Sequence, residues 1–480
     1  MFHNSLIVSI TCCVSMILAM VVGNPAVAAD NAWSALSERQ QSEAMQFAED
    51  YKDFIGSART ALAAIQWTRR VAEEQGYKTF EPGMQVKPGE KYIVVNRDRA
   101  ACLITVGRRP VREGVRVIGA HVDSPHLTLK PRPVVDVKDF ALLQTSYHGG
   151  IKRYQWVNIP LALTGRVDKT DGTTVWIELG LKPDDPILIL PDLAPHVDGD
   201  YRNRNARDVI KAEEMDPIIG SLPEGDENVS EMVMNWLAEH YDITEDDLVS
   251  AELMLVPAIA PRDVGVDRAL VAGYGHDDRG CSYIAIRAAL VVDNPEYTTI
   301  SYLVNNEEVG SINNTGARTT WFRWMVSELL AATEDGDVSE RLLSRTLSRS
   351  TLLSADNTTG LNPLYPGVQE ATNSAYMHQG FILKLYGQGF NANSEFIAHI
   401  RKILDDAGVK WQTHMYKVAG GGGGTIGGFF SVDNMEVIDI GAPLLSMHAP
   451  YSVVSKADMY QLFLGCTAYY QDETPWDSMR

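Results

Sequence analysis

Basic residues are scarce in this 480-residue chain, which has 42 Lys and Arg against 62 Asp and Glu and a formal net charge of −20. No cluster of Lys and Arg forms a basic stripe at any point of the sequence. Because a polyanion would be repelled by this charge, the composition argues against nucleic acid or an anionic membrane as the main partner.

Cysteine is scarce as well, with only 5 in the chain. Two of them, Cys12 and Cys13, lie in the apolar N-terminal segment, which leaves Cys102, Cys281 and Cys466 for the body of the protein. Three scattered cysteines are too few for a disulfide framework, so we expect a fold that does not depend on disulfides.

Motifs for nucleophilic and phosphate chemistry are missing. The sequence has no Gly-x-Ser-x-Gly elbow, and its cysteines have no partner motif. A run of glycines at 420–424 is not followed by Gly-Lys-Ser/Thr, which argues against a Walker-type phosphate loop. A close approach of this backbone to a site or to a neighbouring subunit is the favoured interpretation.

Long apolar runs are absent from the sequence except at the N-terminus. Residues 6–22 are almost wholly apolar, and Ala26-Val27-Ala28 follows as a small-x-small cleavage site. This pattern predicts a signal peptide over 1–28 and an exported protein, periplasmic or extracellular, with no membrane contact for the mature chain. The segment contains His3 but no Lys or Arg before the apolar run, and an uncleaved membrane anchor is the rival interpretation.

The composition is typical of a soluble globular protein, at 45% hydrophobic and 22% charged, and the length suits two or three domains. Strand and helix patterns alternate before residue 128 and after residue 268, whereas the stretch between them is rich in short strands and acidic loops. We therefore predict a catalytic domain formed by 29–128 and 268–480, with 129–267 inserted as a second domain.

The individual elements follow from apolar periodicity. The predicted strands are 91–95, 101–106, 115–120, 154–167, 174–179, 298–304, 381–386 and 437–440. The predicted helices are one or two within 33–76, then 231–241, 283–292, 320–333, 392–407 and one at the C-terminus.

Two adjacent carboxylates, Glu307 and Glu308, follow the apolar run 298–304. Carboxylates at the end of a buried strand are costly unless a cation or a substrate uses them. Neighbours along a strand point to opposite sides, so one glutamate could bind a metal while the other moves protons. A solvated strand-to-loop turn is the alternative explanation for the pair taken alone.

Other acidic and histidine residues recur at the ends of predicted elements. The set comprises His121, Asp277, Glu308, Asp356 and His448. Imidazole and carboxylate ligands suit zinc or a similar divalent ion, and this set is large enough for two metals if one carboxylate bridges them. Two such metals can hold a hydroxide between them and polarise a carbonyl oxygen, with Glu307 as the general base.

Each of these residues also has an ordinary structural explanation. A lone histidine is commonly a buried core residue, and Asp277 could simply begin a helix. Asp123 could cap a turn, although an Asp two residues after His121 can also orient a metal-binding imidazole. Spacing in the sequence does not show whether these side chains meet in space.

Five motifs in a fixed order make the chain similar to the aspartyl aminopeptidase/vacuolar aminopeptidase I family of di-metal exopeptidases. They are Ile118-Gly119-Ala120-His121-Val122-Asp123-Ser124-Pro125, Gly275-His276-Asp277-Asp278-Arg279, Asn306-Glu307-Glu308-Val309-Gly310-Ser311, Ser354-Ala355-Asp356 and Leu445-Ser446-Met447-His448. The resemblance implies an α/β, phosphorylase/hydrolase-like three-layer catalytic domain with an inserted β-rich dimerisation and lid domain. It also implies a homo-oligomer, as in the dodecamers of the family.

The resemblance assigns the site residues to roles. It implies one metal held by His121, Asp277 and Asp356 and a second held by Asp277, Glu308 and His448, with Asp277 as the bridge. Glu307 would activate the water, and Asp123 would orient His121. Lys384 would contact the substrate or the residues around it, and Thr425, Ile426 and Gly427 match the Thr-Ile-Gly turn of the family near the site.

The resemblance implies a metal-dependent aminopeptidase that acts on peptides with a free N-terminus. It also implies two divalent ions per subunit, which we expect to be zinc, with cobalt or manganese as alternatives. The stretch 151–157 and the segment Asn357-Thr358-Thr359 depart from the acid-specific branch, so we expect neutral or apolar N-terminal residues to be preferred. A carboxypeptidase or N-deacylase with the same metal site, or a non-catalytic assembly protein, remains the alternative.

Overall fold

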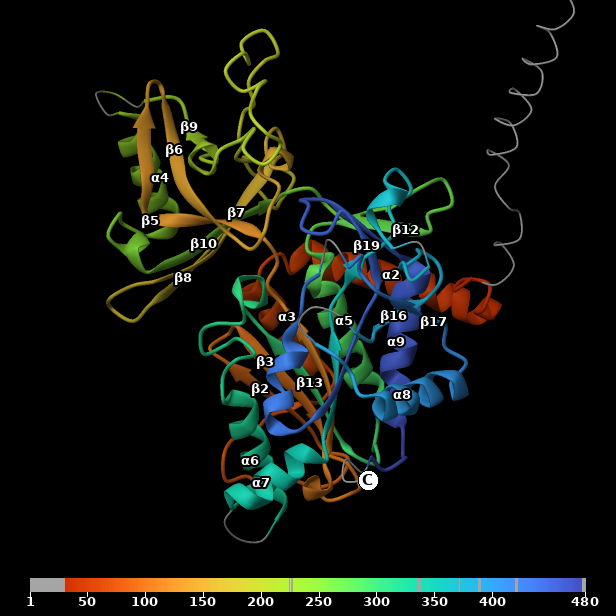
Figure 1. The fold of residues 1–480 in the computed structure, drawn as a ribbon. Helices are drawn as coiled ribbons and strands as arrows, with labels where there is room; N and C mark the ends of the chain where they lie inside the picture. The colour runs from red at the N-terminus through yellow and green to blue at the C-terminus, as the bar shows by residue number, and fades with distance from the viewer. Residues whose placement is uncertain are drawn as a thin grey trace, which may run out of the picture.

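The computed structural model describes residues 31–223, 225, 228–334, 338–370, 372–386, 390–418 and 422–476. The predicted signal peptide, 1–28, and the first two glycines of the 420–424 run lie outside the described residues. Figure 1 shows a large α/β body and a smaller β-rich lobe that projects from it.

A nine-stranded sheet forms the centre of the body, in the order β1-β2-β3-β13-β4-β14-β18-β16-β17. Its strands are β1 (Lys78–Thr79), β2 (Lys91–Asn96), β3 (Ala100–Thr105), β13 (Thr298–Val304), β4 (Val115–His121), β14 (Thr351–Ala355), β18 (Glu436–Gly441), β16 (Phe381–Lys384) and β17 (Trp411–His414). The four central strands, from β13 to β18, run parallel to one another, so their C-terminal ends meet at one edge of the sheet.

Helices cover both faces of this sheet, which gives the three layers that the resemblance implied. One face packs against α2 (Glu38–Ser57), α3 (Ala61–Glu74), α5 (His276–Val291), α8 (Ser394–Asp406) and α9 (Lys456–Gln471). The other face packs against α6 (Trp321–Thr333) and α7 (Glu340–Ser348), which lie together below the sheet in Figure 1. The fully buried strand β4 sends Val117 into one core and its neighbour Ile118 into the other, as the alternation of side chains along a strand requires.

The projecting lobe consists of a six-stranded antiparallel sheet in the order β8-β7-β10-β5-β6-β9, together with the helix α4 (Val229–Tyr241). Its strands are β5 (His126–Val137), β6 (Phe140–His148), β7 (Leu161–Asp168), β8 (Thr174–Leu179), β9 (Ile218–Gly220) and β10 (Ala251–Pro257). A separate apolar core, which includes Trp156 and Leu255, stabilises this lobe. All six strands thus come from the stretch between the first and the second motif.

A third, five-stranded sheet lies beside the body and has the order β11-β12-β20-β19-β15. Its strands are β11 (Arg262–Val264), β12 (Leu270–Gly273), β20 (Ser452–Ser455), β19 (Pro443–Leu445) and β15 (Thr358–Thr359). None of these five strands was predicted from the sequence. Among the described residues, the helices all lack either the length or the apolar character needed to cross a bilayer.

Candidate metal centre

The predicted metal ligands come from separate segments that meet at the C-terminal edge of the parallel strands. His121 is the last residue of β4, and Asp356 follows β14 directly. Asp277 lies in the first turn of α5, and His448 follows β19. The register of the sheet pairs His121 with Val304 of β13, so the turn that carries Glu308 follows at the same edge.

These side chains form two groups that share one residue. His121, Asp277 and Asp356 make one group, and Asp277, Glu308 and His448 make the other, with one ligand atom per residue and all atoms of a group within 4.8 Å of one another. Asp277 Oδ1 lies 3.3 Å from His121 Nε2, while Asp277 Oδ2 lies 3.3 Å from His448 Nε2. The two oxygens of one carboxylate therefore face different histidines, which is the arrangement that a bridging ligand needs.

Hydrogen bonds direct both imidazoles so that Nε2 faces the centre. His121 Nδ1 donates to the backbone carbonyl of Asp123 over 3.1 Å and also lies 3.3 Å from Asp123 Oδ1. His448 Nδ1 donates to the Gly150 carbonyl over 2.7 Å. The outer nitrogen of each ring is thereby engaged, which leaves Nε2 as the free ligand atom.

The charge of the centre fits a divalent cation. Burial and the nearby Asp277 raise the pKa of Glu308 to about 9, and burial raises the pKa of Asp356 as well. Glu308 Oε1 is buried without a hydrogen-bond partner. Because crowded, buried carboxylates favour a positive charge among them, and because the donors are imidazole and carboxylate, the site suits zinc.

Glu307 lies next to the centre but belongs to neither group. Its Oε2 is 3.9 Å from His121 Nε2, and its side chain is 19% exposed, so a substrate can reach it. Burial, supported by the carboxylates of Asp356 and Asp123, raises the pKa of Glu307 to about 7. A carboxyl group with such a pKa can both accept and donate a proton near neutral pH.

The separation of the two glutamates has a different cause from the one we predicted. The strand β13 ends at Val304, and Asn306 has a φ of +62° and begins a 3-10 turn, Glu307–Val309. The glutamates therefore diverge because they sit on a turn, and not because neighbours alternate along a strand.

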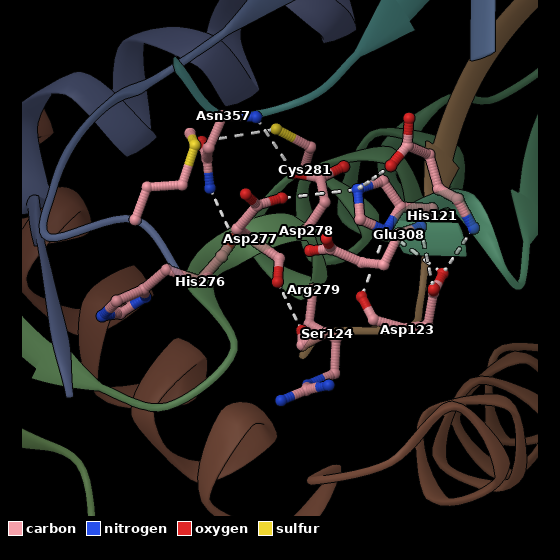
Figure 2. A network of polar contacts seen from close by, with 12 residues as sticks. His121, Asp123, Ser124, His276, Asp277, Asp278, Arg279, Cys281, Glu308 and Asn357 are labelled. Carbon is pink, nitrogen blue, oxygen red and sulfur yellow. Dashed lines mark hydrogen bonds and ion pairs between the residues drawn. The ribbon is translucent and has the colours of Figure 1, made fainter. Parts of the chain in front are cut away.

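Asp123 connects several parts of the site. Besides its contact with His121, its carboxylate accepts the backbone N–H groups of Glu307 and Glu308, at 3.1 and 3.2 Å. It also accepts a 2.8 Å hydrogen bond from His148 Nε2. Figure 2 shows Asp123 directed toward His121. These contacts outweigh the effect of burial and hold the pKa of Asp123 well below its usual range, so it stays ionised.

Further polar residues around the centre were not found from the sequence. The Asn357 side chain donates to the His276 carbonyl, and its backbone N–H donates to Asp278 Oδ1, as Figure 2 shows. Ser124 Oγ donates to the Asp277 carbonyl. These bonds fix the turn that carries Asp277. The only signal for them in the sequence was that each residue adjoins a predicted site residue.

Lys384 is the last residue of β16 and lies near Asp356. Its Nζ is 3.4 Å from the Asn357 carbonyl. Burial opposes the charge, but the nearby Asp356 outweighs it and raises the pKa of the Lys384 ammonium. The same side chain lines a cavity with Tyr386, Phe390, His414 and Tyr416. Lys384 thus lies near the candidate ligand Asp356 and at the wall of a small cavity.

Comparisons with known proteins agree with this geometry. The model of the aminopeptidase I zinc metalloprotease (M18) family matches residues 54–470. A probable M18 family aminopeptidase 1 from Clostridium acetobutylicum is 39% identical over 454 residues, which cover 92% of this chain and 97% of the relative. Its counterpart from Thermotoga maritima is 36% identical over 444 residues, or 90% of this chain and 97% of the relative.

Solved structures show the same fold. An M18-family aminopeptidase from Thermotoga maritima has a TM-score of 0.86 at 35% identity and covers 92% of this chain and 99% of its own. A Saccharomyces cerevisiae mApe1 dodecamer has a TM-score of 0.74 at 20% identity, with 90% of this chain and 99% of that chain covered. The predicted resemblance and the α/β fold with a β-rich lobe are confirmed, and the chain belongs to the M18 family of zinc metalloaminopeptidases.

Proposed function

We propose that this M18 family member removes the N-terminal residue from peptides with a free α-amine, with two divalent cations in the two ligand groups and Glu307 as the proton carrier. The observation that carries the proposal is the shared carboxylate. Asp277 turns one oxygen to each histidine, and Glu307 stands beside the pair without joining either group. Bound there, zinc ions would supply Lewis acidity, which polarises the scissile carbonyl and lowers the pKa of water.

The chain's own residues divide the remaining work. His121 and Asp356 complete one ligand group with Asp277, and Glu308 and His448 complete the other. Glu307 takes a proton from the attacking water and gives it to the leaving amine nitrogen, a cycle suited to a pKa of about 7. Asp123 holds His121 in the orientation that presents Nε2.

The variant Glu307→Gln tests the assignment of the base. Gln keeps the shape and half-buried position of the side chain but cannot accept the proton, so turnover should fall by about 10²–10⁴-fold or more. Bound zinc and the melting temperature should stay near those of the wild type, because Glu307 is in neither ligand group. Near-normal turnover in this variant would show that another group is the base.

The substrate class is tested with a panel of aminoacyl anilides and N-blocked peptides. Lys384 is the proposed contact for the N-terminal residue. The cavity that it lines with His414 and Asp439 measures only about 20 Å³, which is room for a water molecule and not for a side chain. We propose a preference for neutral or apolar N-terminal residues, on the sequence departures at 151–157 and Asn357-Thr358-Thr359. Cleavage of blocked peptides alone would instead indicate a carboxypeptidase or N-deacylase. Faster cleavage of Asp and Glu anilides would refute the proposed preference.

Assembly and location complete the proposal. We propose a homo-oligomer as large as a dodecamer, supported by the dodecameric mApe1 of the same fold, and light scattering on the purified protein measures its size.

We also propose export, supported by the apolar segment 6–22 and the Ala26-Val27-Ala28 site. N-terminal sequencing of the secreted protein should give a start near Ala29, and an intact Met1 in the cytoplasm would contradict export.

A further inference from the structure

A short segment of the inserted lobe lies directly against the metal centre. His148 is the last residue of β6, and Gly149 and Gly150 follow it. We call these three residues the 148–150 strap. Although the strap continues the six-stranded sheet, its polar contacts reach residues at the edge of the nine-stranded sheet.

The first contact joins His148 to Asp123. His148 Nε2 donates to Asp123 Oδ2 over 2.8 Å, and the two side chains are only 15% and 2% exposed. The other carboxylate oxygen of Asp123 lies 3.3 Å from His121 Nδ1, which also donates to the backbone carbonyl of Asp123 over 3.1 Å. A chain of polar contacts thus runs from the lobe through one carboxylate to a metal-ligand imidazole.

The ring of His148 is itself held in place. It stacks on the ring of His126, with centroids 4.6 Å apart and an interplanar angle of 13°. His126 Nδ1 in turn lies 2.8 Å from the Ser124 carbonyl. The stack fixes the plane of the His148 ring. Because the N–H bond at Nε2 lies in that plane, the stack also sets the direction of the hydrogen bond to Asp123.

The second and third contacts come from the glycines. The Gly150 carbonyl accepts the 2.7 Å bond from His448 Nδ1, so the strap also holds the imidazole of the other ligand group. Gly149 has a φ of +75°, and a Cβ there would lie 3.0 Å from Glu308 Oε2. The backbone of the strap therefore passes so close to Glu308 that a side chain would press on a ligand.

We propose that the 148–150 strap positions the metal ligands, so that the docking of the inserted lobe sets the affinity of the centre for zinc. His148 is a positioning residue in this scheme, since it acts on His121 through Asp123. The inference rests on the proposed ligand sets. Hydrogen bonds to the outer nitrogen of a ligand histidine fix its ring and its tautomer, and loss of such a partner typically costs 10–100-fold in metal affinity.

Two variants of His148 separate positioning from packing. His148→Phe keeps an aromatic ring to stack on His126 but has no N–H donor. His148→Gln loses the ring but places an amide N–H near the position of Nε2. If the hydrogen bond to Asp123 is what matters, Phe should weaken zinc binding by about 10–100-fold, while Gln should stay within about threefold of the wild type.

The affinity is measured on the full chain after removal of metal, by zinc titration in competition with a chromophoric chelator. Replacing zinc with Co²⁺ gives a second readout, because its absorption bands report ligand geometry and should shift in the Phe variant alone. His240→Phe is the matched control. His240 also stacks on a ring, that of Trp236, and bonds to a backbone carbonyl, but it lies at an exposed position of α4.

If His148→Phe binds zinc as tightly as the wild type, the proposal is overturned. If His148→Gln binds zinc weakly while His148→Phe binds it normally, the ring packing alone matters, and the proposal is overturned as well. None of these measurements involves substrate or turnover. A failure here is therefore distinct from a failure of the proposed aminopeptidase reaction, which the Glu307→Gln variant tests.

Discussion

At the scale of single residues, the centre depends most on the carboxylate of Asp277. It is 8% exposed, contacts both ligand histidines, and is held in an ionised state because those contacts outweigh desolvation and lower its pKa. Asp356, by comparison, belongs to one ligand group only. The two aspartates should therefore differ in how many metal ions they help to hold.

We expect Asp277→Asn and Asp356→Asn to differ in zinc content. Asn at 277 removes the charge and one ligand oxygen, so both sites should weaken and the zinc content should fall below one ion per chain. Asn at 356 should lose only the site of the first group. Elemental analysis of dialysed protein measures this, with Glu307→Gln as the fully loaded control. Equal zinc loss in both Asn variants would contradict a bridging role.

The sequence predicted the ligand candidates because each is a His or carboxylate at the end of an apolar strand or beside a helix start. His148 was not predicted, although it too ends a strand. Its role depends on the inserted lobe meeting the body, which places residues 25 positions apart, His148 and Asp123, in contact. Local patterns contain no information on that docking, so positioning residues of this kind are found only in the folded structure.

At the scale of elements, an ion cluster around the buried Lys456 joins α2, β11 and α9. Asp263 of β11 lies 2.8 Å from Lys52 Nζ and 2.9 Å from Lys456 Nζ, and the Lys456 side chain is fully buried. Arg268 contacts the other oxygen of Asp263. Burial alone would raise the pKa of Asp263, but these cations outweigh it and hold that pKa well below its usual range.

Asp263→Asn should destabilise the protein at pH 7, because the buried Lys456 ammonium loses its nearest carboxylate. The loss should be smaller than the about 3–5 kcal/mol of a buried charge left without any partner, since Glu49 Oε1 stays 3.7 Å from Lys456 Nζ. Since the pKa of Asp263 is lowered by folding, its contribution is complete above the unfolded pKa of about 4 and is lost as the pH falls toward the lower folded value. Urea unfolding should therefore show a large difference from wild type at pH 7 and a smaller one near pH 3.

Asp293→Asn is the matched control, because Asp293 is exposed. Its unfolding free energy should equal that of the wild type at both pH values. A deficit in Asp263→Asn that is constant across this pH range would rule out the ion cluster as its cause.

Two elements show where sequence patterns failed. The long strands β5 and β6 were not predicted. In β5, Lys130-Pro131-Arg132-Pro133 interrupts the alternation, and proline is rare inside a strand. The structure accommodates the prolines in a register shift between Leu129 and Val134. The nine-residue helix α7 was missed although the sequence contains its signals: Ser339 caps its first turn, and Leu343 and Leu347 lie on one buried face. In contrast, the buried run Thr298–Val304 was predicted residue for residue.

At the scale of the whole molecule, the candidate ligands span most of the chain, from His121 to His448. Between the first and second ligands the chain leaves the body, forms the six-stranded sheet and returns. The metal centre therefore ties together the body, the strap of the inserted lobe and the five-stranded sheet, whose strand β19 precedes His448. Ligands that close such long loops are brought together only in the native state.

Removal of the metal should consequently lower the stability of the whole body as well as abolish turnover. A cation that binds only the native state contributes about 2.7 kcal/mol at a free concentration 100 times its Kd, and more as binding tightens. Calorimetry after treatment with a chelator should show a lower melting temperature that zinc restores. Calcium should not restore it, because a site with imidazole ligands disfavours that ion.

The six-stranded lobe has its own apolar core, so its unfolding should respond less to the chelator than that of the body. Hydrogen exchange measures the stability of the lobe and the body separately. Without metal, amide protection should fall in the C-terminal residues of β4, β13 and β14, and it should persist in β7 and β10. If protection instead fell evenly across both parts, the lobe and body would unfold as one unit. The contact between lobe and body through the 148–150 strap would then contribute to the free energy of unfolding of the whole protein, as the apolar cores do.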